Sequence, residues 1–279
     1  MTTRTIPEYQ SETGGGRLGR HIHHDPRSRA YVISEDLLPG AYTSAVHTVR
    51  IPVLDQGDLG SCTGNAAEAF AGTDPLYAVI PASVAARPTG DAAADEKQAV
   101  ALYSAATRLD DARGTYPPTD TGSSGVAVAQ AAQKAGLISG YQHAFSLDTA
   151  LKALAASPLI VGVNWYDGFD NPDGGGLVKI AGSVRGGHEF LLYGIDAEGQ
   201  RVLARNSWGE SWGSDGCFSF SFDDFGRLLD EDGDATLFVP LNKPAPTPNP
   251  PQPAPTPTPD DVDAALAASM HSWLTAKGL

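Results

Sequence analysis

Cysteines, basic residues and long apolar runs are all scarce in this sequence, and each scarcity excludes a class of protein. The 279 residues include two cysteines, Cys62 and Cys217, which excludes a framework of several disulfides. The apolar runs, such as 159–165, are far shorter than the roughly 20 residues that cross a bilayer. With 19 Lys and Arg against 33 Asp and Glu, the net charge is −14. We therefore expect neither nucleic acid nor an anionic membrane as a partner.

The first 16 residues are polar and lack the apolar segment of a signal peptide. The sequence therefore predicts a cytoplasmic protein by default, and free thiols suit a reducing compartment. Release by cell lysis, or packaging in a virus particle, leaves no such segment, so both of these locations stay open.

Composition divides the chain into four regions. Residues 1–36 form a polar N-terminal arm, and residues 37–242 hold most of the aromatic and aliphatic side chains and are the expected folded domain. Residues 243–259 are rich in proline, which predicts an extended, semi-rigid linker. Residues 260–279 predict a short amphipathic helix that is marginal alone in water. Such a helix either docks on a protein partner, another copy or its own domain, or is a frayed tail.

Within residues 37–242, helical patterns come first and strand patterns follow. This order favours an α+β fold with two lobes, a helical first lobe and an antiparallel β second lobe. The predicted helices are Cys62–Ala71, 95–109, 124–135 and Leu147–Ala156, and the predicted strands are 159–164, 189–196, 200–206 and 217–222.

Cys62 follows a loop rich in glycine and is the first residue of a predicted helix. A thiolate is the nucleophilic form of cysteine, and the unpaired amides and positive dipole at a helix N-terminus stabilise it. Gln56 lies just upstream, where its side-chain amide can donate to a developing oxyanion. The alternative for Cys62 alone is a buried structural cysteine.

A thiol nucleophile also needs a base, and the base needs a group that orients it. His188 follows two glycines at the head of a predicted strand, and Asn206 ends the next strand. If these strands are antiparallel neighbours, the two side chains meet at one end of the sheet. Asn206 then holds one tautomer of the imidazole, and Trp208 shields their hydrogen bond from water.

Together these segments resemble the papain-like cysteine peptidases, especially compact bacterial and phage members. The resemblance spans roughly residues 37–242 and rests on Asp-Gln-Gly and Gly-Ser-Cys around Gln56 and Cys62, Gly-Gly-His at His188, and Asn-Ser-Trp-Gly from Asn206. The sequence departs from the family pattern at Leu59, where relatives have another cysteine, and at Thr63, where they have an aromatic residue.

The resemblance implies a cleft between the two lobes and peptide-bond hydrolysis through an acyl-enzyme. Cys62 is then the nucleophile, His188 the general base and later acid, Asn206 its orienting group, and Gln56 an oxyanion donor. The implied substrate is a peptide or protein.

Gly122 and Ser123, which open a predicted helix, resemble the substrate-groove segment of the family, and Trp208 is assigned to substrate binding with them. No cofactor and no metal is implied. Residues 1–36 are too short for the long inhibitory propeptide of secreted relatives, although a small arm over the cleft stays open.

Two polar clusters have less specific interpretations. His21, His23 and His24 are interpreted as part of a polar arm rather than a metal site, because no ligand pattern completes them. The acidic run 230–234 fails the spacing of a calcium loop and is interpreted as a solvated turn.

Two further functions remain as alternatives. One is a phage or bacterial hydrolase of peptidoglycan peptides, by analogy with modular cell-wall enzymes. The other is a non-catalytic binding module that docks through its C-terminal helix.

Overall fold

The computed structural model describes residues 17–248 except 24 and 113. The described part of the chain belongs to one compact unit, which ends at residue 248. The predicted C-terminal helix lies outside the described residues, as do most of the proline-rich linker and His24. Within the described part of the chain, none of the helices has the length and apolar character of a membrane span.

The first lobe is helical. It contains α1 (Cys62–Ala71), α2 (Leu76–Val79), α3 (Ala92–Ala106) and α4 (Gly125–Lys134), whose side chains include many alanines. Small side chains let these helices approach closely. A Cβ at Gly64 of α1 would lie 2.2 Å from the carbonyl oxygen of Ala99 in α3, so only glycine fits there. The side chains of Asp91 and Ser124 cap α3 and α4 by accepting from backbone amides.

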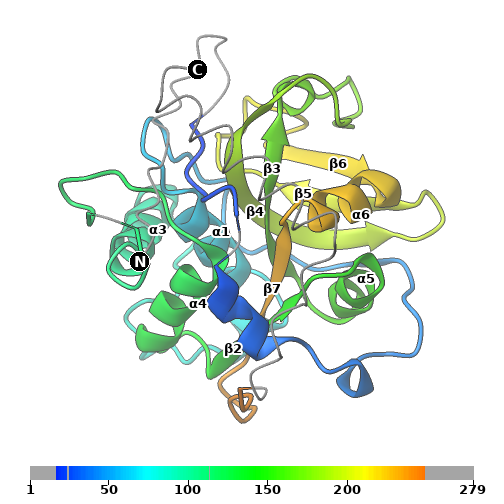
Figure 1. Cartoon of the computed structure of the whole chain (residues 1–279). Helices are drawn as coiled ribbons and strands as arrows, with labels where there is room; N and C mark the ends of the chain where they lie inside the picture. The colour runs from blue at the N-terminus through cyan, green and yellow to red at the C-terminus, as the bar shows by residue number, and fades with distance from the viewer. Residues whose placement is uncertain (1–16, 24, 113, 249–279) are drawn as a thin grey trace, which may run out of the picture. The chain divides into compact units, whose positions relative to one another are not determined.

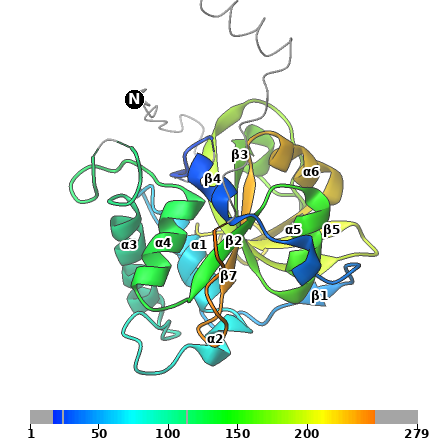
Figure 2. The same cartoon turned by 60° about the horizontal axis from the view of Figure 1, so that its bottom comes forward.

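The second lobe is a seven-stranded sheet in which every pairing of the named strands is antiparallel. Its order is β2-β7-β3-β4-β5-β6, and β1 pairs with β4. Two helices, α5 and α6, lie with this lobe, on the side opposite α1, α3 and α4 (Figures 1 and 2). The bounds are β1 Ala45–Val46, β2 Gly140–Ala144, β3 Leu159–Tyr166, β4 Val184–Asp196, β5 Arg201–Arg205, β6 Cys217–Ser221, β7 Asp234–Val239, α5 Leu147–Ala156 and α6 Phe222–Asp230.

Strand β4 separates two hydrophobic cores. Phe190 and Leu192 belong to the core of the sheet lobe, whereas Leu191 belongs to the core shared with the helical lobe. Successive side chains of a strand point to opposite faces, which explains this division. The same alternation places His188 on the face of Phe190 and Glu189 on the face of Leu191.

Most predicted elements are present with small shifts in their ends. Helices α1 and α5 have the predicted bounds, α3 begins at Ala92 rather than 95, and β3 and β4 are longer than predicted. Strands β2 and β7 and helix α6 were not predicted, because their segments mix polar and apolar residues. The α+β class, with a helical lobe and an antiparallel lobe, is confirmed.

The interpretation of 230–234 as a solvated turn is wrong at its end. Asp234 is 2% exposed and begins β7 in the middle of the sheet. A buried carboxylate requires a partner. Its closest partner is Arg20, a residue 214 positions away along the chain, which local sequence patterns do not indicate. Nδ1 of His143 also lies 3.4 Å from Oδ2 of Asp234.

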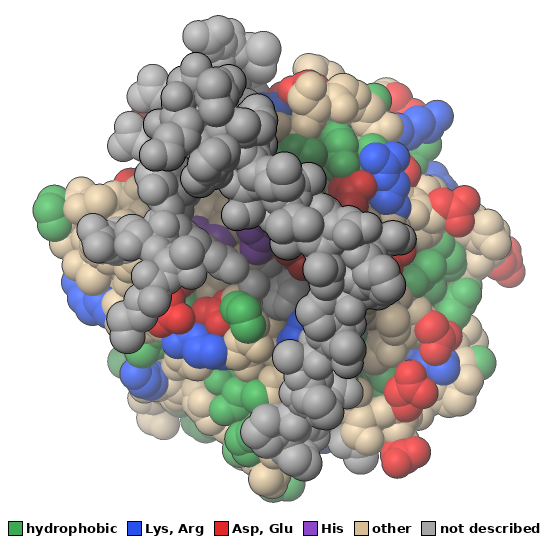
Figure 3. Space-filling view, viewed as in Figure 1, with side chains coloured by type: hydrophobic (Ala, Val, Ile, Leu, Met, Phe, Trp, Pro, Cys, Tyr) green, Lys and Arg blue, Asp and Glu red, His purple; other side chains and the backbone are tan. Residues whose placement is uncertain are grey.

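Residues 17–23 run between the two lobes, where Figure 1 draws them in dark blue. The backbone amide of Arg20 donates to the carbonyl of Gly187 at 3.0 Å. The amide of His21 donates to the carbonyl of Ser123 at 3.0 Å, and the amide of Ser123 donates to the carbonyl of Gly19 at 2.9 Å. This segment, which we call the arm segment (residues 17–21), therefore bridges the lobes. On the face seen in Figure 3, acidic and basic side chains are interspersed.

Candidate active site

Cys62 is the first residue of α1 and its side chain is fully buried. Loss of water around the thiol raises the pKa of Cys62 to about 12, and the carboxyl of Glu189 adds to this increase. Hydrogen bonds from the backbone amides of Glu189 and Thr63 act in the opposite direction. In this conformation the thiol therefore holds its proton at neutral pH. Because the backbone amide of Glu189 contacts the thiol, the thiol lies beside β4, at the residue that follows His188.

His188 and Asn206 form a direct hydrogen bond in which Nε2 lies 2.7 Å from Oδ1. The same Oδ1 accepts from the backbone amide of Ser207 at 2.8 Å, which assigns the orientation of the side-chain amide. Because Oδ1 can only accept, Nε2 carries the proton and Nδ1 is left with a lone pair. Nδ1 has no hydrogen-bond partner among the described residues, so it is the basic nitrogen of the ring.

Aromatic rings enclose this hydrogen bond. Trp208 lies 4.9 Å from the His188 ring at an interplanar angle of 34°, and Trp165 lies 4.8 Å from it at 78°. Burial disfavours the charged imidazolium and lowers the pKa of His188 to about 4, although the hydrogen bond to Asn206 opposes the change. The imidazole is therefore neutral at pH 7. These positions agree with the shielding role predicted for Trp208.

Gln56 is tied to the segment that carries Asn206. Its Oε1 accepts from the Ser207 hydroxyl at 2.7 Å, and its backbone amide donates to the Ser207 carbonyl at 2.9 Å. Its Nε2 donates to the Leu59 carbonyl at 2.8 Å, in the loop before Cys62. A primary amide has two N–H donors, so one of them is still free to bind an oxyanion. Sequence analysis missed Ser207, which joins these two parts of the site.

The residues assigned to substrate binding all contact the arm segment. Ser123 exchanges backbone hydrogen bonds with its residues, and the indole Nε1 of Trp208 donates to the carbonyl of Arg17 at 3.0 Å. Gly122 has φ +66, and a Cβ there would lie 2.3 Å from the carbonyl oxygen of Gly19. Only glycine combines that backbone angle with so close an approach. The arm segment thus contacts all three residues at which the sequence predicts substrate binding.

Cys62 and His188 are both 0% exposed, and they are not hydrogen bonded to each other. The structure therefore brings the predicted residues to one place, but it places them in a closed, neutral arrangement. A thiolate–imidazolium pair can form only if Nδ1 of His188 accepts the thiol proton. A substrate can bind at Ser123 and Trp208 only if the arm segment leaves them.

The histidines of the arm are held by the protein's own groups. The Nε2 atom of His21 lies 3.2 Å from the Thr121 carbonyl, and Nδ1 of His23 lies 2.5 Å from Asp232. Among residues 17–248, apart from the two that are not described, no group of three or more His, Cys, Asp or Glu side chains is arranged to hold a metal ion.

Comparison with known proteins bears on the same segments. The model of the papain family of cysteine proteases matches residues 96–226, which contain Gly122, Ser123, His188, Asn206 and Trp208. The chain is papain-like. The matched segment leaves out Gln56 and Cys62, whose assignment rests on their place in the structure and on the motifs around them.

The papain-like chain has relatives of known sequence and structure. Cathepsin B-like CP3 of Giardia intestinalis is 29% identical over 187 residues, which are 60% of this chain and 62% of that protein. The chain therefore spans less than two thirds of this relative.

Two solved structures share the fold. Xylellain, a cysteine protease from Xylella fastidiosa, has a TM-score of 0.58 and 17% identity, covering 83% of this chain and all of the other. The procathepsin B S9 of Trypanosoma congolense has a TM-score of 0.57 and 12% identity, covering 80% of this chain and 86% of the other. These likenesses confirm the two-lobed papain-like fold.

Proposed function

We propose that this papain-like chain is a cysteine peptidase that hydrolyses peptide bonds through an acyl-enzyme on Cys62. The observation that carries the proposal is the 2.7 Å hydrogen bond between His188 Nε2 and Asn206 Oδ1. This bond fixes the tautomer of His188 in which Nδ1 is the basic nitrogen. The next residue, Glu189, contacts the Cys62 thiol through its backbone amide. A nucleophile, a base and a group that orients the base are the three parts this chemistry needs.

The proposed reaction has two halves. Nδ1 of His188 takes the thiol proton, and the sulfur attacks the carbonyl carbon of the substrate. The Cys62 amide and the free N–H of Gln56 donate to the resulting oxyanion. The imidazolium then gives its proton to the leaving amine, which leaves a thioester. Water, deprotonated by the same Nδ1, hydrolyses the thioester, and the thiol regains its proton.

The conformation described is the resting form of this enzyme. Burial keeps both the thiol and the imidazole neutral, which suppresses reactivity. Departure of the arm segment from Ser123 and Trp208 lets water and substrate reach the pair. Because water favours charged forms, opening brings the pKa values of Cys62 and His188 toward each other.

The test is alkylation of the full chain by a thiol-directed epoxide at about pH 6.5, near the ordinary pKa of histidine. Intact-mass and peptide-level spectrometry locate the adduct in wild type and in His188→Ala. Cys217, which is half-buried at the start of β6, serves as an internal control thiol. The Arg20→Ala variant, which loses a side chain that holds the arm segment, is treated in parallel.

We expect a single adduct on Cys62 that requires His188 and forms faster in Arg20→Ala than in wild type. Peptide cleavage should follow the same order of variants. Absence of any Cys62 adduct in both wild type and folded Arg20→Ala, or labelling of Cys62 no faster than Cys217, would contradict the proposal.

A further inference from the structure

The carboxylate of Asp120 joins three segments that are far apart in the chain. Its Oδ2 accepts from the backbone amide of Gly60 at 2.9 Å and from Nη2 of Arg17 at 2.9 Å. Its Oδ1 accepts from the hydroxyl of Tyr103 at 2.5 Å. Burial by itself would raise the pKa of Asp120, but the hydrogen bonds from these three donors outweigh it and lower the pKa. The side chain is therefore ionised at neutral pH.

Gly60 belongs to the loop that leads into the proposed nucleophile. We call residues 56–61, which precede α1, the nucleophile loop. Within it, Nε2 of Gln56 donates to the carbonyl of Leu59 at 2.8 Å. The next residue, Gly60, is the one that Asp120 holds. Both proposed oxyanion donors, the side chain of Gln56 and the amide of Cys62, are therefore attached to a loop that Asp120 holds in place.

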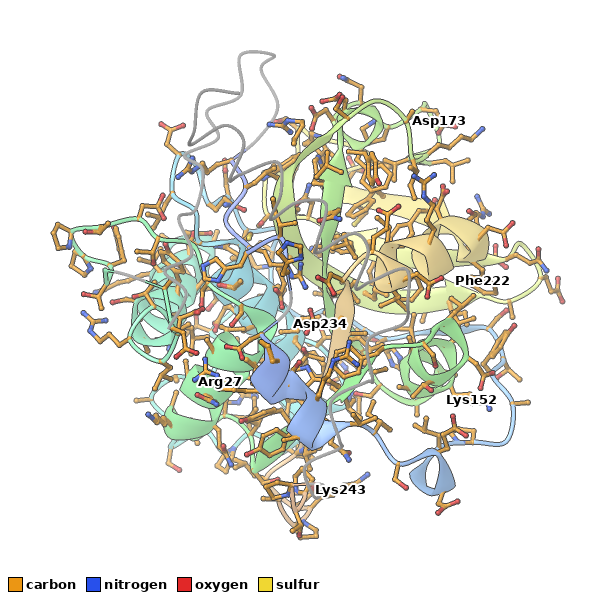
Figure 4. The ribbon with its side chains drawn as sticks, viewed as in Figure 1. Arg27, Lys152, Asp173, Phe222, Asp234 and Lys243 are labelled. Carbon is orange, nitrogen blue, oxygen red and sulfur yellow. The ribbon has the colours of Figure 1, made fainter. Side chains whose placement is uncertain are left out.

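Tyr103 extends this contact to the segment of Gly122. Its hydroxyl donates to Asp120 and accepts from the amide of Gly122 at 3.0 Å. Burial and the hydrogen bond to Asp120 raise the pKa of Tyr103, so the hydroxyl keeps its proton. Helix α3, which carries Tyr103, lies to the left of the labelled Asp234 in Figure 4. The contact is therefore distinct from the one between Arg20 and Asp234.

The close approach of the nucleophile loop to Asp120 depends on glycine. A Cβ at Gly60 would lie 2.7 Å from Oδ1 and 3.2 Å from Oδ2 of Asp120. The three atoms nearest to that Cβ all belong to Asp120. Because Tyr103 also holds the carboxylate, Asp120 cannot turn aside without losing a second hydrogen bond. An added methyl group at Gly60 therefore acts on this contact and on little else.

The arm segment supplies only one of the three donors to Asp120. The side chain of Arg17 is 24% exposed, and a Cβ at Gly19 would lie 2.0 Å from the carbonyl oxygen of Gly60. The arm segment thus lies directly on the nucleophile loop. The hydrogen bonds from Gly60 and Tyr103 do not involve the arm segment, so they can remain when it departs and substrate binds.

We propose that Asp120 is a positioning residue for the oxyanion site. Through Gly60, it holds Gln56 and the amide of Cys62 where they can donate to the negative oxygen of the intermediate. This inference rests on the proposed peptidase function and deepens it. Among the described residues, Asp120 has no hydrogen bond to Cys62 or His188. Its loss should therefore weaken the binding of the oxyanion and spare the reactivity of the thiol.

The test compares two reactions of Cys62, of which only one forms an oxyanion. With a peptidyl aldehyde, the sulfur bonds to the carbonyl carbon, the C=O π electrons move to the oxygen, and the thiol proton reaches that oxygen by way of His188. With the same peptide ended by a 2-pyridyl disulfide, a new S–S bond forms as the old one breaks. Pyridine-2-thiol then leaves with the electron pair and the proton.

Both reactions are measured on the full-length protein without a catalytic readout. Every sample carries Cys217→Ser, so that Cys62 is the one thiol in the chain. Calorimetry gives the dissociation constant of the aldehyde, and the absorbance of the released pyridine-2-thione gives the rate of disulfide exchange. The alcohol that corresponds to the aldehyde measures binding of the peptide part alone.

Two variants disturb the contact from opposite sides. Asp120→Ala removes the acceptor, and Gly60→Ala pushes the nucleophile loop away from it. Each should raise the dissociation constant of the aldehyde about 10- to 100-fold, the loss that a displacement of about 1 Å can cause. The rate of disulfide exchange should stay close to wild type. Asp120→Asn keeps an oxygen that accepts from the Gly60 amide, so it should restore most of the affinity.

Matched controls separate this effect from a general loss of charge or of glycine. Asp196→Asn removes a carboxylate from the exposed pair with Arg201, and Gly174→Ala adds a Cβ with nothing within 4 Å. Both should match wild type in the two reactions. Arg17→Ala removes the donor of the arm segment and should change both reactions by the same factor.

Some results would overturn the proposal. Equal changes in the two reactions, in variants whose circular dichroism matches wild type, would show that Asp120 supports only the fold or access to the thiol. Unchanged aldehyde affinity in Asp120→Ala and Gly60→Ala would also overturn it. If Asp120→Ala does not fold, Gly60→Ala and Tyr103→Phe decide, because both keep the carboxylate. Tyr103→Phe loses one hydrogen bond and should weaken aldehyde binding about fivefold.

The two proposals fail in different ways. An aldehyde that binds wild type far better than the alcohol does, with the same affinity in every variant, keeps the peptidase and removes the role of Asp120. An aldehyde that binds wild type no better than the alcohol, although Cys62 reacts with the disulfide, counts against the peptidase and the role of Asp120 together.

Discussion

Two adjacent residues of β4, His188 and Glu189, belong to two buried polar regions that differ in hydrogen bonding and in charge. His188 faces the aromatic core, makes one short hydrogen bond to Asn206 and carries no charge. Glu189 faces the helical lobe, has no hydrogen bond to its carboxyl group among the described residues and lies beside the charged pair of Arg20 and Asp234. The first region is complete within the two lobes, whereas the second depends on a residue of the arm.

Burial acts on both regions by the same physical rule. Loss of water disfavours the charged form, so it lowers the pKa of His188 and raises the pKa of Glu189. The negative charge of Asp234 raises the pKa of Glu189 further, and Arg20 opposes this. Burial by itself would raise the pKa of Asp234, but the charges and hydrogen bonds of Arg20 and His143 together outweigh burial and lower it. A neutral polar region thus needs only apolar surroundings, whereas a buried charged group needs a counter-ion.

The largest expected effect is the loss of chemistry in the first region. His188→Ala removes the base and Cys62→Ser replaces the nucleophile, so kcat/KM for a peptide substrate should fall by about 10³-fold or more. Cys217→Ser should keep the wild-type rate. Circular dichroism spectra that match wild type confirm that each variant is folded. Retention of a tenth of the activity in either catalytic variant contradicts the assigned roles.

The second prediction separates the two buried carboxyl groups that face Arg20, those of Glu189 and Asp234. Asp234→Asn leaves the guanidinium of Arg20 without its close partner, so the free energy of unfolding should fall by about 3 kcal/mol. Glu189→Gln should change it by less than about 1 kcal/mol at pH 7, because the raised pKa of Glu189 already favours its neutral form. Urea unfolding measures both. Equal losses would show that Glu189 and Asp234 share the charge equally.

The third prediction tests the orienting role of Asn206. Asn206→Ala removes the acceptor for His188 Nε2 and should lower kcat/KM about 10- to 100-fold, less than the loss of the imidazole itself. Asn206→Asp keeps an acceptor and adds a negative charge, which raises the pKa of His188. The acid limb of the rate–pH profile should therefore move to higher pH. An unchanged acid limb would contradict contact between these two side chains in the active form.

The fourth prediction concerns pH and stability, where the two regions have opposite signs. His188 has a lowered folded-state pKa of about 4, so its contribution to stability is present above the unfolded pKa and is lost as pH falls toward 4. Glu189 has a raised folded-state pKa, so its contribution is present below the unfolded value and is lost as pH rises. The stability of Glu189→Gln relative to wild type should therefore increase from about pH 5 to pH 7.5. A flat difference would indicate an ionised Glu189.

The smallest expected effect concerns the contact between the arm segment and the aromatic wall. Trp208→Phe keeps an aromatic ring over His188 but removes the donor to the Arg17 carbonyl. The loss of one neutral hydrogen bond, about 1 kcal/mol, should increase the rate of Cys62 alkylation about fivefold by favouring the open form. An alkylation rate equal to wild type would show that this bond does not hold the arm.

Much of the fold follows from local patterns that short segments can express. Alanine-rich and amphipathic segments made α1 and α5 predictable, and alternating or continuous apolar runs located β3 and β4. The ends of α3 and the existence of β7 were not predictable in this way. Strand β7 begins with Asp234, and a carboxylate is a poor signal for a buried strand until its counter-ion is known.

The proposed site divides in the same manner. The motifs around Cys62, His188 and Asn206 pointed to a nucleophile, a base and an orienting amide, and the structure places Asn206 on His188 as expected. The roles of these residues in catalysis remain a proposal. Ser207, Glu189 and Arg20 were missed. Glu189 had one visible signal, a charge inside an apolar strand directly after His188, and Arg20 had none.

What the sequence by itself determined is therefore the local chemistry: a cysteine at the head of a helix, a histidine and an asparagine at strand ends, and a papain-like order of these parts. Only the tertiary structure decided that the arm segment bridges the two lobes and that Arg20 pairs with Asp234 across the fold. The physical reason is that secondary-structure periods and motifs act over a few residues, whereas the counter-ion of a buried charge can come from any part of the chain.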